Sequence, residues 1–135
     1  LMRNYMIKFG IEKFKEKPIL GWGIANYRVL LDQDIGRRGY AHNNYIELLV
    51  DVGTIGMIVY YLMYIFSLFK LKKIEIGIYK NYRYLFISLF LSILIIGYSS
   101  VYYYNKHFYI LLAMASVLIG GKSNEKNIII EDNKK

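Results

Sequence analysis

The feature that most constrains the fold of this chain is the separation of its apolar residues from its charged ones. Three stretches contain no Asp, Glu, Lys or Arg, and they cover residues 52–69, 84–105 and 107–121. A helix needs about 20 apolar residues to cross the hydrocarbon core of a bilayer. The pattern therefore predicts an all-α integral membrane protein with about three transmembrane helices, at residues 46–69, 84–105 and 107–121.

The composition excludes several other classes of protein. The 135 residues include no Cys, which rules out a disulfide scaffold, a thiolate metal site and a cysteine nucleophile. The net charge of +8 would suit nucleic acid, but the cations flank the apolar stretches and are not spaced among stacking aromatic residues. No spacing of His, Asp and Glu suggests a metal site. We expect no cofactor, no metal and no nucleic-acid partner.

The segment before the apolar stretches has a helical pattern of its own. Met2, Met6 and Phe9 recur at three- and four-residue steps between charged residues, which is typical of an amphipathic helix at a membrane interface. Pro18 and the glycines after it end that periodicity. A loop is expected from there to about Ala41.

Two asparagines mark the start of the first transmembrane helix. Either Asn43 or Asn44 can cap a helix that runs from about Tyr45 towards Phe69. Lys and Arg are enriched in the loop after this helix and Lys in the tail at residues 122–135, so both are expected in the cytoplasm. Residues 1–45 then form an extracytoplasmic helix and loop, although they are also basic. Four tyrosines are expected at the level of the lipid headgroups: Tyr102, Tyr103, Tyr104 and Tyr109.

His42 and two glycines form the most suggestive pattern for chemistry. His42-Asn43 is followed, after nine residues, by Gly53-Thr54-Ile55-Gly56. An imidazole at the junction of a loop and a membrane helix is suited to proton transfer, but a lone histidine can equally cap the helix or anchor it at the interface. Each glycine costs a helix about 1 kcal/mol relative to Ala unless close packing or close approach of another backbone offsets it. The alternative is that both glycines serve packing between membrane helices.

Three motifs in order carry a family resemblance. They are Arg3 opening the amphipathic segment, the turn Pro18-Ile19-Leu20-Gly21-Trp22-Gly23 followed by Asn26-Tyr27, and the element from His42 to Gly56. With these motifs the sequence from Arg3 to about Gly121 resembles the C-terminal part of the bacterial O-antigen ligase and polymerase family, the Wzy/WaaL-like membrane glycosyltransferases. In that family's pattern a leucine follows the Arg after three residues. Ile7 stands there after Arg3, whereas Arg28 fits no better because Asp32 stands in that position.

The resemblance implies a fold, a location and a reaction. The chain would be the C-terminal fragment of a polytopic, GT-C-like helical bundle in the bacterial cytoplasmic (inner) membrane. The whole protein would be a metal-independent, inverting glycosyltransferase. It would transfer an oligosaccharide from undecaprenyl diphosphate to a sugar hydroxyl on the extracytoplasmic face. Its partners would be the lipid-linked oligosaccharide, the sugar acceptor, membrane lipid and the remaining helices of the full-length protein, and the isolated fragment is expected to be inactive.

The residues can be assigned roles in that chemistry. A sugar hydroxyl is a weak nucleophile that needs a base, for which His42 is the candidate, and guanidinium groups stabilise a departing diphosphate. The candidates for binding the diphosphate are Arg3, Arg37 and Arg38; the alternative for the last two is a basic surface that attracts anionic lipid. The supporting candidates are Asn43, Glu47, Asp51, Gly53 and Gly56. Glu47 or Asp51 would orient His42, bind sugar, or simply mark a helix end that faces water.

The sequence leaves the exact function open in two ways. A polymerase and a ligase in O-antigen or capsule assembly differ in their acceptor, and the local motifs suit both, with the polymerase slightly favoured. The competing class is a non-catalytic, three-span membrane scaffold subunit. In such a subunit His42 and the glycines would serve only capping and helix packing.

Overall fold

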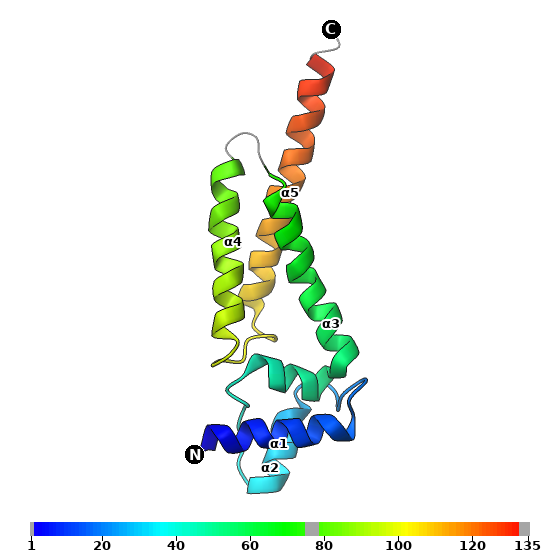
Figure 1. Cartoon of the computed structure of the whole chain (residues 1–135), viewed down its shortest axis with the longest axis vertical. Helices are drawn as coiled ribbons and strands as arrows, with labels where there is room; N and C mark the ends of the chain where they lie inside the picture. Colours follow the sequence, from blue (N-terminus) through cyan, green and yellow to red (C-terminus); the bar gives the residue numbers. More distant parts are fainter. Residues whose placement is uncertain (1, 75–78, 133–135) are drawn as a thin grey trace. The chain divides into compact units, whose positions relative to one another are not determined.

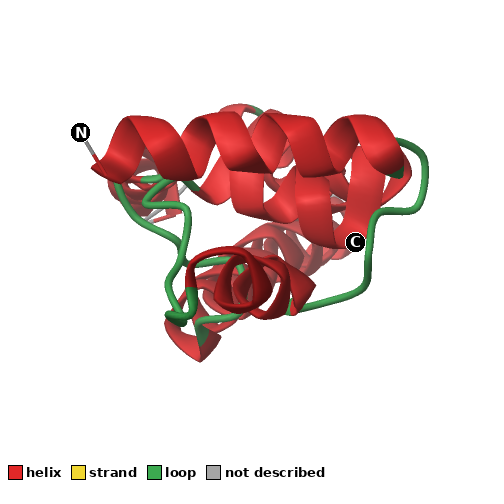
Figure 2. Ribbon diagram, turned by 90° about the horizontal axis from the view of Figure 1, so that it is seen from below, coloured by secondary structure: helices red, strands yellow, loops and turns green. Residues whose placement is uncertain are grey.

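The computed structural model describes the backbone of residues 2–74 and 79–132, and the side chains of residues 2–74 and 81–120. These residues form helices joined by loops and turns, without a strand in the part described, so the predicted all-α class is confirmed (Figure 2). The helices are α1 (Met2–Glu16), α2 (Asn26–Ile35), α3 (Asn44–Lys72), α4 (Tyr79–Ile96) and α5 (Lys106–Asp132). The chain divides into two compact units: unit 1 is Leu1–Leu62 with Ile93–Tyr104, and unit 2 is Met63–Ser92 with Asn105–Lys135.

The core of unit 1 is formed by one face of α1 packed on α2 and the start of α3. Met6 and Phe9 are buried against Tyr27, Leu31 and Val50. The rings of Phe9 and Tyr27 meet edge to face at 5.9 Å, and the Tyr27 hydroxyl donates to the carbonyl of Met6 over 2.8 Å. Each such buried side chain contributes about 1.5–3 kcal/mol. The amphipathic character of α1 is therefore confirmed, with its buried residues covered by protein, and the expected place of this helix at a membrane interface stays a prediction.

Helix α2 lies where a loop was expected. Its N-cap residue, Ala25, has a left-handed backbone with φ 64° and makes no side-chain capping bond. The cap comes from α3, because the Asp51 carboxylate accepts hydrogen bonds from the N–H of Ala25 over 2.8 Å and of Tyr27 over 2.7 Å. The helix ends at Gly36, also left-handed, whose N–H bonds to the carbonyl of Asp32. A cap supplied from a distant residue leaves no local sequence signal, which explains the wrong prediction.

Helix α3 is interrupted at Gly53, whereas a continuous helix was expected (Figure 1). Gly53 has φ 67° and ψ −170°, and a Cβ atom there would lie 2.3 Å from the carbonyl oxygen of Ile19. The turn after Pro18 fits into this break. The Thr54 N–H donates to the Pro18 carbonyl and the Trp22 N–H to the Val50 carbonyl, each over 2.8 Å. Two of the predicted sequence motifs therefore bind each other through their backbones.

In the described residues, one helix is long and apolar enough to cross a membrane by its length and composition, namely α3. Shorter apolar helices cover Asn81–Ile96 and Lys106–Gly120. The three predicted spans thus stay a prediction. Helix α4 ends at Ile96, not near residue 105, and α5 continues through most of the predicted tail to Asp132, while residues 133–135 lie outside the described part.

The turn after α4 belongs to unit 1 and changes the interpretation of its tyrosines. Tyr102 and Tyr103 are 2% and 5% exposed, and both of their N–H groups donate to the side-chain oxygen of Asn44, over 2.8 and 2.9 Å. These two rings are packed inside protein, and the expected position of the four tyrosines at headgroup level stays a prediction. Tyr104 and Tyr109 are exposed.

Unit 2 has a buried aromatic contact and several exposed apolar side chains among its described residues. Tyr64 of α3 meets Phe90 of α4 edge to face at 5.7 Å, and both rings are buried. Arg83 donates to the carbonyl of Ile74 over 2.5 Å, which satisfies a free carbonyl just beyond the end of α3. Several large apolar side chains of this unit, Phe66 and Phe69 among them, are more than half exposed.

Candidate functional site

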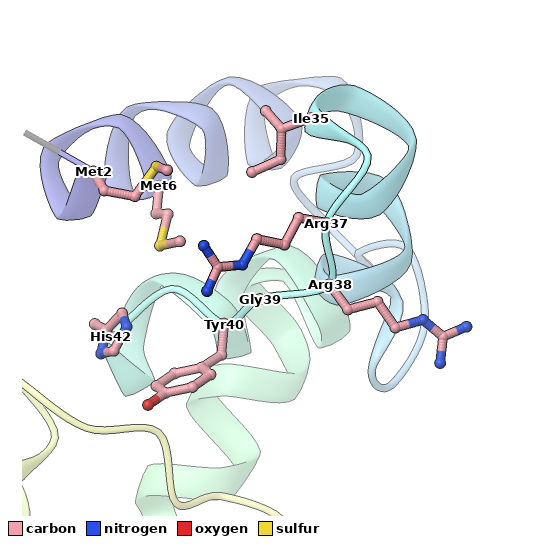
Figure 3. A pocket seen from close by; sticks show the side chains of 8 residues that line it. All are labelled: Met2, Met6, Ile35, Arg37, Arg38, Gly39, Tyr40 and His42. Atoms are coloured by element: carbon pink, nitrogen blue, oxygen red, sulfur yellow. The ribbon is translucent and has the colours of Figure 1, made fainter.

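Unit 1 contains a recess of about 320 Å³ beside the loop that joins α2 to α3 (Figure 3). Helix α1 contributes Met2 and Met6 to its lining, and α2 contributes Ile35. The loop contributes the remaining residues, which are Arg37, Arg38, Gly39, Tyr40 and His42. The recess therefore joins two thioether side chains, a guanidinium group, a phenol ring and an imidazole at one place.

The two neighbouring arginines point in different directions. Figure 3 shows the guanidinium group of Arg37 extending into the recess, between Met6 and Tyr40, whereas that of Arg38 points away. The Arg38 Nε lies 3.5 Å from the carboxylate of Asp32, and its side chain is 80% exposed. Arg38 and Tyr40 also line a second recess, of about 340 Å³, together with Ala25, Arg28, Val29 and Gly39. Arg37 is thus the cation best placed to meet a ligand that also meets His42.

His42 is held in an unusual conformation. Its φ is 50°, in the left-handed region that residues with a Cβ atom seldom adopt. Its half-buried ring lies 4.1 Å from the ring of Tyr40, with 42° between the ring planes. The cap of α3 comes from Asn43 instead, whose side-chain oxygen accepts from the N–H groups of Tyr45 and Ile46 over 3.0 and 3.1 Å. Helix capping therefore does not account for His42, and the prediction that an asparagine caps this helix is confirmed.

Both carboxylates on the first turns of α3 are fully buried. The Glu47 carboxylate accepts from the N–H of Ala41 over 2.8 Å and from Nε of Arg28 over 3.2 Å. Asp51 accepts from the hydroxyl of Tyr103 as well as from the start of α2. Neither carboxylate lines the recess, and their complete burial excludes the alternative of a helix end that faces water.

Two tyrosines and an arginine around these carboxylates have shifted pKa values. Burial raises the pKa of Tyr103, and the hydrogen bond and charge of Asp51 raise it further. Burial also raises the pKa of Tyr27, with Glu47 adding to the effect. For Arg28, burial lowers the pKa, but Glu47 and the Tyr104 hydroxyl raise it by more, so that the net change is upwards.

Arg3 lies outside the recess. Its guanidinium group donates to the carbonyl of Tyr98 over 2.8 Å, and its central carbon lies 5.3 Å from the centre of the Tyr98 ring. The side-chain amide of Asn43 donates to the same carbonyl over 3.4 Å. The structure thus brings Arg3 beside the residue that follows His42, and it does not include Arg3 in the lining shared by Arg37 and His42.

The two glycines stay outside the recess. Gly53 permits the contact with the turn after Pro18, and a Cβ atom at Gly56 would lie 2.5 Å from the Cβ of Val52 on its own helix. The expected close backbone approach is confirmed at Gly53. His107 is exposed and contacts the Asn105 side chain at the start of α5, over 2.6 Å.

Sequence reasoning missed two residues of this region. Arg28 does not fit the family's arginine pattern, yet its guanidinium group contacts Glu47 and Tyr104. Tyr40 gave no signal beyond its place two residues before His42. Among the described residues, no three His, Asp or Glu side chains come together as a metal site would need, and a metal-free reaction remains a prediction.

The fold and the recess define a class of helical protein with a basic recess that contains a histidine. The recess residues lie close in sequence to α3, a helix apolar enough to cross a membrane. Residues 1–61 match the sequence model of a family described as O-antigen ligase, so this segment of the chain is similar to that family. The matched segment includes every predicted site residue, but the match does not extend to Gly121 as the sequence resemblance suggested. Comparisons with curated proteins and with solved structures gave no match.

The match to this family supports a function at a general level. It indicates a ligase-like or polymerase-like role in polysaccharide biosynthesis, with lipid-linked oligosaccharide and sugar as the substrate classes. Proteins of the family are generally found in the inner membrane, and α3 is compatible with that location.

Proposed function

We propose that this chain carries part of the active site of an O-antigen or capsular polysaccharide polymerase or ligase. In this proposal His42 is the general base, and Arg37 binds the diphosphate of the undecaprenyl carrier. The observation that carries the proposal is that Arg37 and His42 line one recess in the segment that matches the O-antigen ligase family. The polymerase remains slightly favoured over the ligase.

The proposed reaction is a single displacement with inversion at the anomeric carbon of the donor sugar. The acceptor hydroxyl loses its proton to the imidazole of His42 as its oxygen bonds to that carbon. The bond from the carbon to the phosphate oxygen breaks, and undecaprenyl diphosphate leaves with the electron pair. A guanidinium group suits the leaving group because it donates two parallel hydrogen bonds and keeps its charge. No metal ion is needed in this scheme.

The other predicted cations have secondary parts in the proposal. Arg38 is directed away from the recess and pairs with Asp32, so we assign it to attraction of the anionic carrier and not to direct binding. Arg3 holds the turn after α4 through the carbonyl of Tyr98. The proposed diphosphate site thus depends chiefly on Arg37.

The membrane location in this proposal rests on α3 and on the exposed apolar side chains of unit 2. Phe66 and Phe69 are 63% and 61% exposed, a pattern that suits lipid or further helices of a longer protein as neighbours. We propose that residues 1–45 lie on the extracytoplasmic side and that such further helices complete the grooves for lipid and acceptor.

Replacing His42 tests the proposal directly. In His42→Gln, made in the chromosomal gene, surface polysaccharide should fall about 100-fold or more, because general base catalysis typically contributes 10²–10⁴-fold. His107→Gln is the matched control, since His107 is exposed and its ring contacts the side chain of the neighbouring Asn105, and it should leave the polymer unchanged. Normal polymer from His42→Gln at normal protein levels would favour the non-catalytic scaffold.

A further inference from the structure

Glu47 and Arg28 contact the surroundings of His42 from two directions, yet neither residue lines the recess. The Glu47 side chain is fully buried, and that of Arg28 is 35% exposed. The question is what this ion pair does so close to the proposed base.

The first contact fixes the backbone immediately before His42. One carboxylate oxygen of Glu47 accepts from the N–H of Ala41 over 2.8 Å, and Ala41 is itself completely buried. Since the next residue has a φ of 50°, the chain turns sharply at this point. A left-handed backbone is unfavourable for a residue with a Cβ atom and persists only when the surrounding structure holds it. The buried Glu47 carboxylate restrains the backbone in this conformation by accepting the hydrogen bond from the Ala41 N–H.

The second contact fixes the ring that packs on His42. The other oxygen of Glu47 accepts from Nε of Arg28 over 3.2 Å. The guanidinium carbon of Arg28 lies 5.8 Å from the centre of the Tyr40 ring and 4.6 Å from that of Tyr104, whose hydroxyl also accepts from Arg28. The Tyr40 ring in turn lies 4.1 Å from the imidazole. Arg28 therefore restrains the aromatic wall against which His42 rests.

We infer that Glu47 and Arg28 form a positioning pair that sets the conformation of His42, one through its backbone and the other through Tyr40. This inference rests on the proposed function, and it deepens it by giving Arg28 a role that does not involve the diphosphate. The pair touches no substrate, so both members are positioning residues. Loss of the carboxylate charge should release the Ala41 N–H and the Arg28 guanidinium group together.

Nuclear magnetic resonance of the histidine rings tests the inference without depending on activity. The full-length protein in detergent is labelled with ¹⁵N-histidine, and the ring signals of His42 and His107, the two histidines of this chain, are assigned by their loss in His42→Gln and His107→Gln. In Glu47→Gln the His42 signals should shift and broaden as the ring samples several orientations, while those of His107 stay in place. Polymer output in cells should fall about 10- to 100-fold, as expected when a reacting group is misplaced by about 1 Å.

Glu16→Gln provides the matched control. It makes the same chemical change in an ion pair of 2.7 Å with Lys13, but Glu16 is 46% exposed and lies on α1. Both sets of histidine signals and the polymer should remain as in the wild type. Arg28→Lys is the second variant, because it keeps the charge but loses the planar group that contacts Tyr40 and Tyr104; it should move the His42 signals in the same direction.

The outcomes separate this inference from the proposed function. His42 signals that stay unchanged in Glu47→Gln would overturn the inference, even if His42→Gln abolishes the polymer. If Glu47→Gln moves them while His42→Gln leaves the polymer normal, the positioning role stands and the proposed function fails. Should Glu47→Gln not fold, Arg28→Lys decides, and unchanged His42 signals in that variant would overturn the inference.

Discussion

At the scale of single residues, the direction in which an arginine side chain points decides its role more than its charge does. Arg37 and Arg38 are neighbours with the same side chain, but only Arg37 extends into the recess that contains His42 (Figure 3). Arg38 instead pairs with Asp32 at 3.5 Å, with 80% of its side chain exposed. Exposed ion pairs contribute about 0–1 kcal/mol, so little is lost when one is removed.

Arg37→Gln should therefore reduce polymer synthesis far more than Arg38→Gln. A hydrogen bond to a charged group is worth about 1.5–3 kcal/mol, which corresponds to a loss of roughly 10- to 100-fold. For Arg38→Gln we expect a change of no more than about threefold. The measurement is the amount and length of surface polysaccharide at equal protein levels. Equal losses in the two variants would contradict the assignment of the diphosphate to Arg37.

Tyr103 gives a prediction about stability at alkaline pH. Its pKa is raised in the folded protein by burial and by Asp51, above the ordinary value of about 10. The fold therefore favours the neutral ring, and this contribution is complete below pH 10 and lost progressively as the pH rises above 10. Each group of this kind lowers the free energy of unfolding by about 1.4 kcal/mol for every pH unit in that range. In Tyr103→Phe the free energy of unfolding should therefore fall less steeply above pH 10, by that amount per pH unit. Denaturant titration at several pH values measures this slope, and a slope equal to that of the wild type would contradict the prediction.

At the scale of the elements, unit 1 is held together by contacts between segments far apart in the sequence. Asp51 of α3 caps α2, and the turn after Pro18 exchanges backbone hydrogen bonds with the break in α3. Local patterns allowed prediction of the amphipathic α1, of the turn and of the asparagine cap. They could not reveal α2 or the bend at Gly53, because both depend on partners brought together only by folding.

Gly53→Ala should destabilise unit 1 markedly. The added Cβ atom would lie 2.3 Å from the carbonyl oxygen of Ile19, at a position where φ is 67°. Gly36→Ala is the matched control, because its φ is 65° but no atom lies within 4 Å of the added Cβ. We expect the free energy of unfolding to fall by about 1–2 kcal/mol in Gly36→Ala, from backbone strain alone, and by about 3 kcal/mol or more in Gly53→Ala. Thermal unfolding in detergent measures both, and equal values would show that the contact with Ile19 is unimportant.

Only those parts of the candidate site that lie in local sequence motifs could be predicted. His42 and Arg37 could be chosen from residue type and place in the sequence, and they lie in one recess. Arg3, chosen by the same reasoning, contacts Tyr98 instead. The contacts of Arg28 with Glu47 and Tyr104 span three separate segments, so no local spacing could have indicated them.

At the scale of the whole molecule, the question is on which side of the membrane the recess lies. In the sequence, the apolar part of α3 after Gly53 stands between the residues that line the recess and the basic residues Lys70, Lys72 and Lys73. Basic residues collect on the cytoplasmic side of a membrane helix, and a lipid-linked donor on the outer face would require the opposite side for His42. Orientation and function are therefore linked through a single helix.

Cysteine labelling in intact cells tests this orientation, because the chain itself contains no Cys and each single-cysteine variant can be compared with the unsubstituted protein. Lys15→Cys, at an exposed site on α1, should react with a membrane-impermeant maleimide added outside the cells. Lys70→Cys, exposed near the end of α3, should react only after the cells are permeabilised. The two sites control for each other, since each carries the same change at an exposed lysine. Labelling of Lys15→Cys only after permeabilisation would place the recess in the cytoplasm. A base and a diphosphate site there could not take part in an extracytoplasmic transfer.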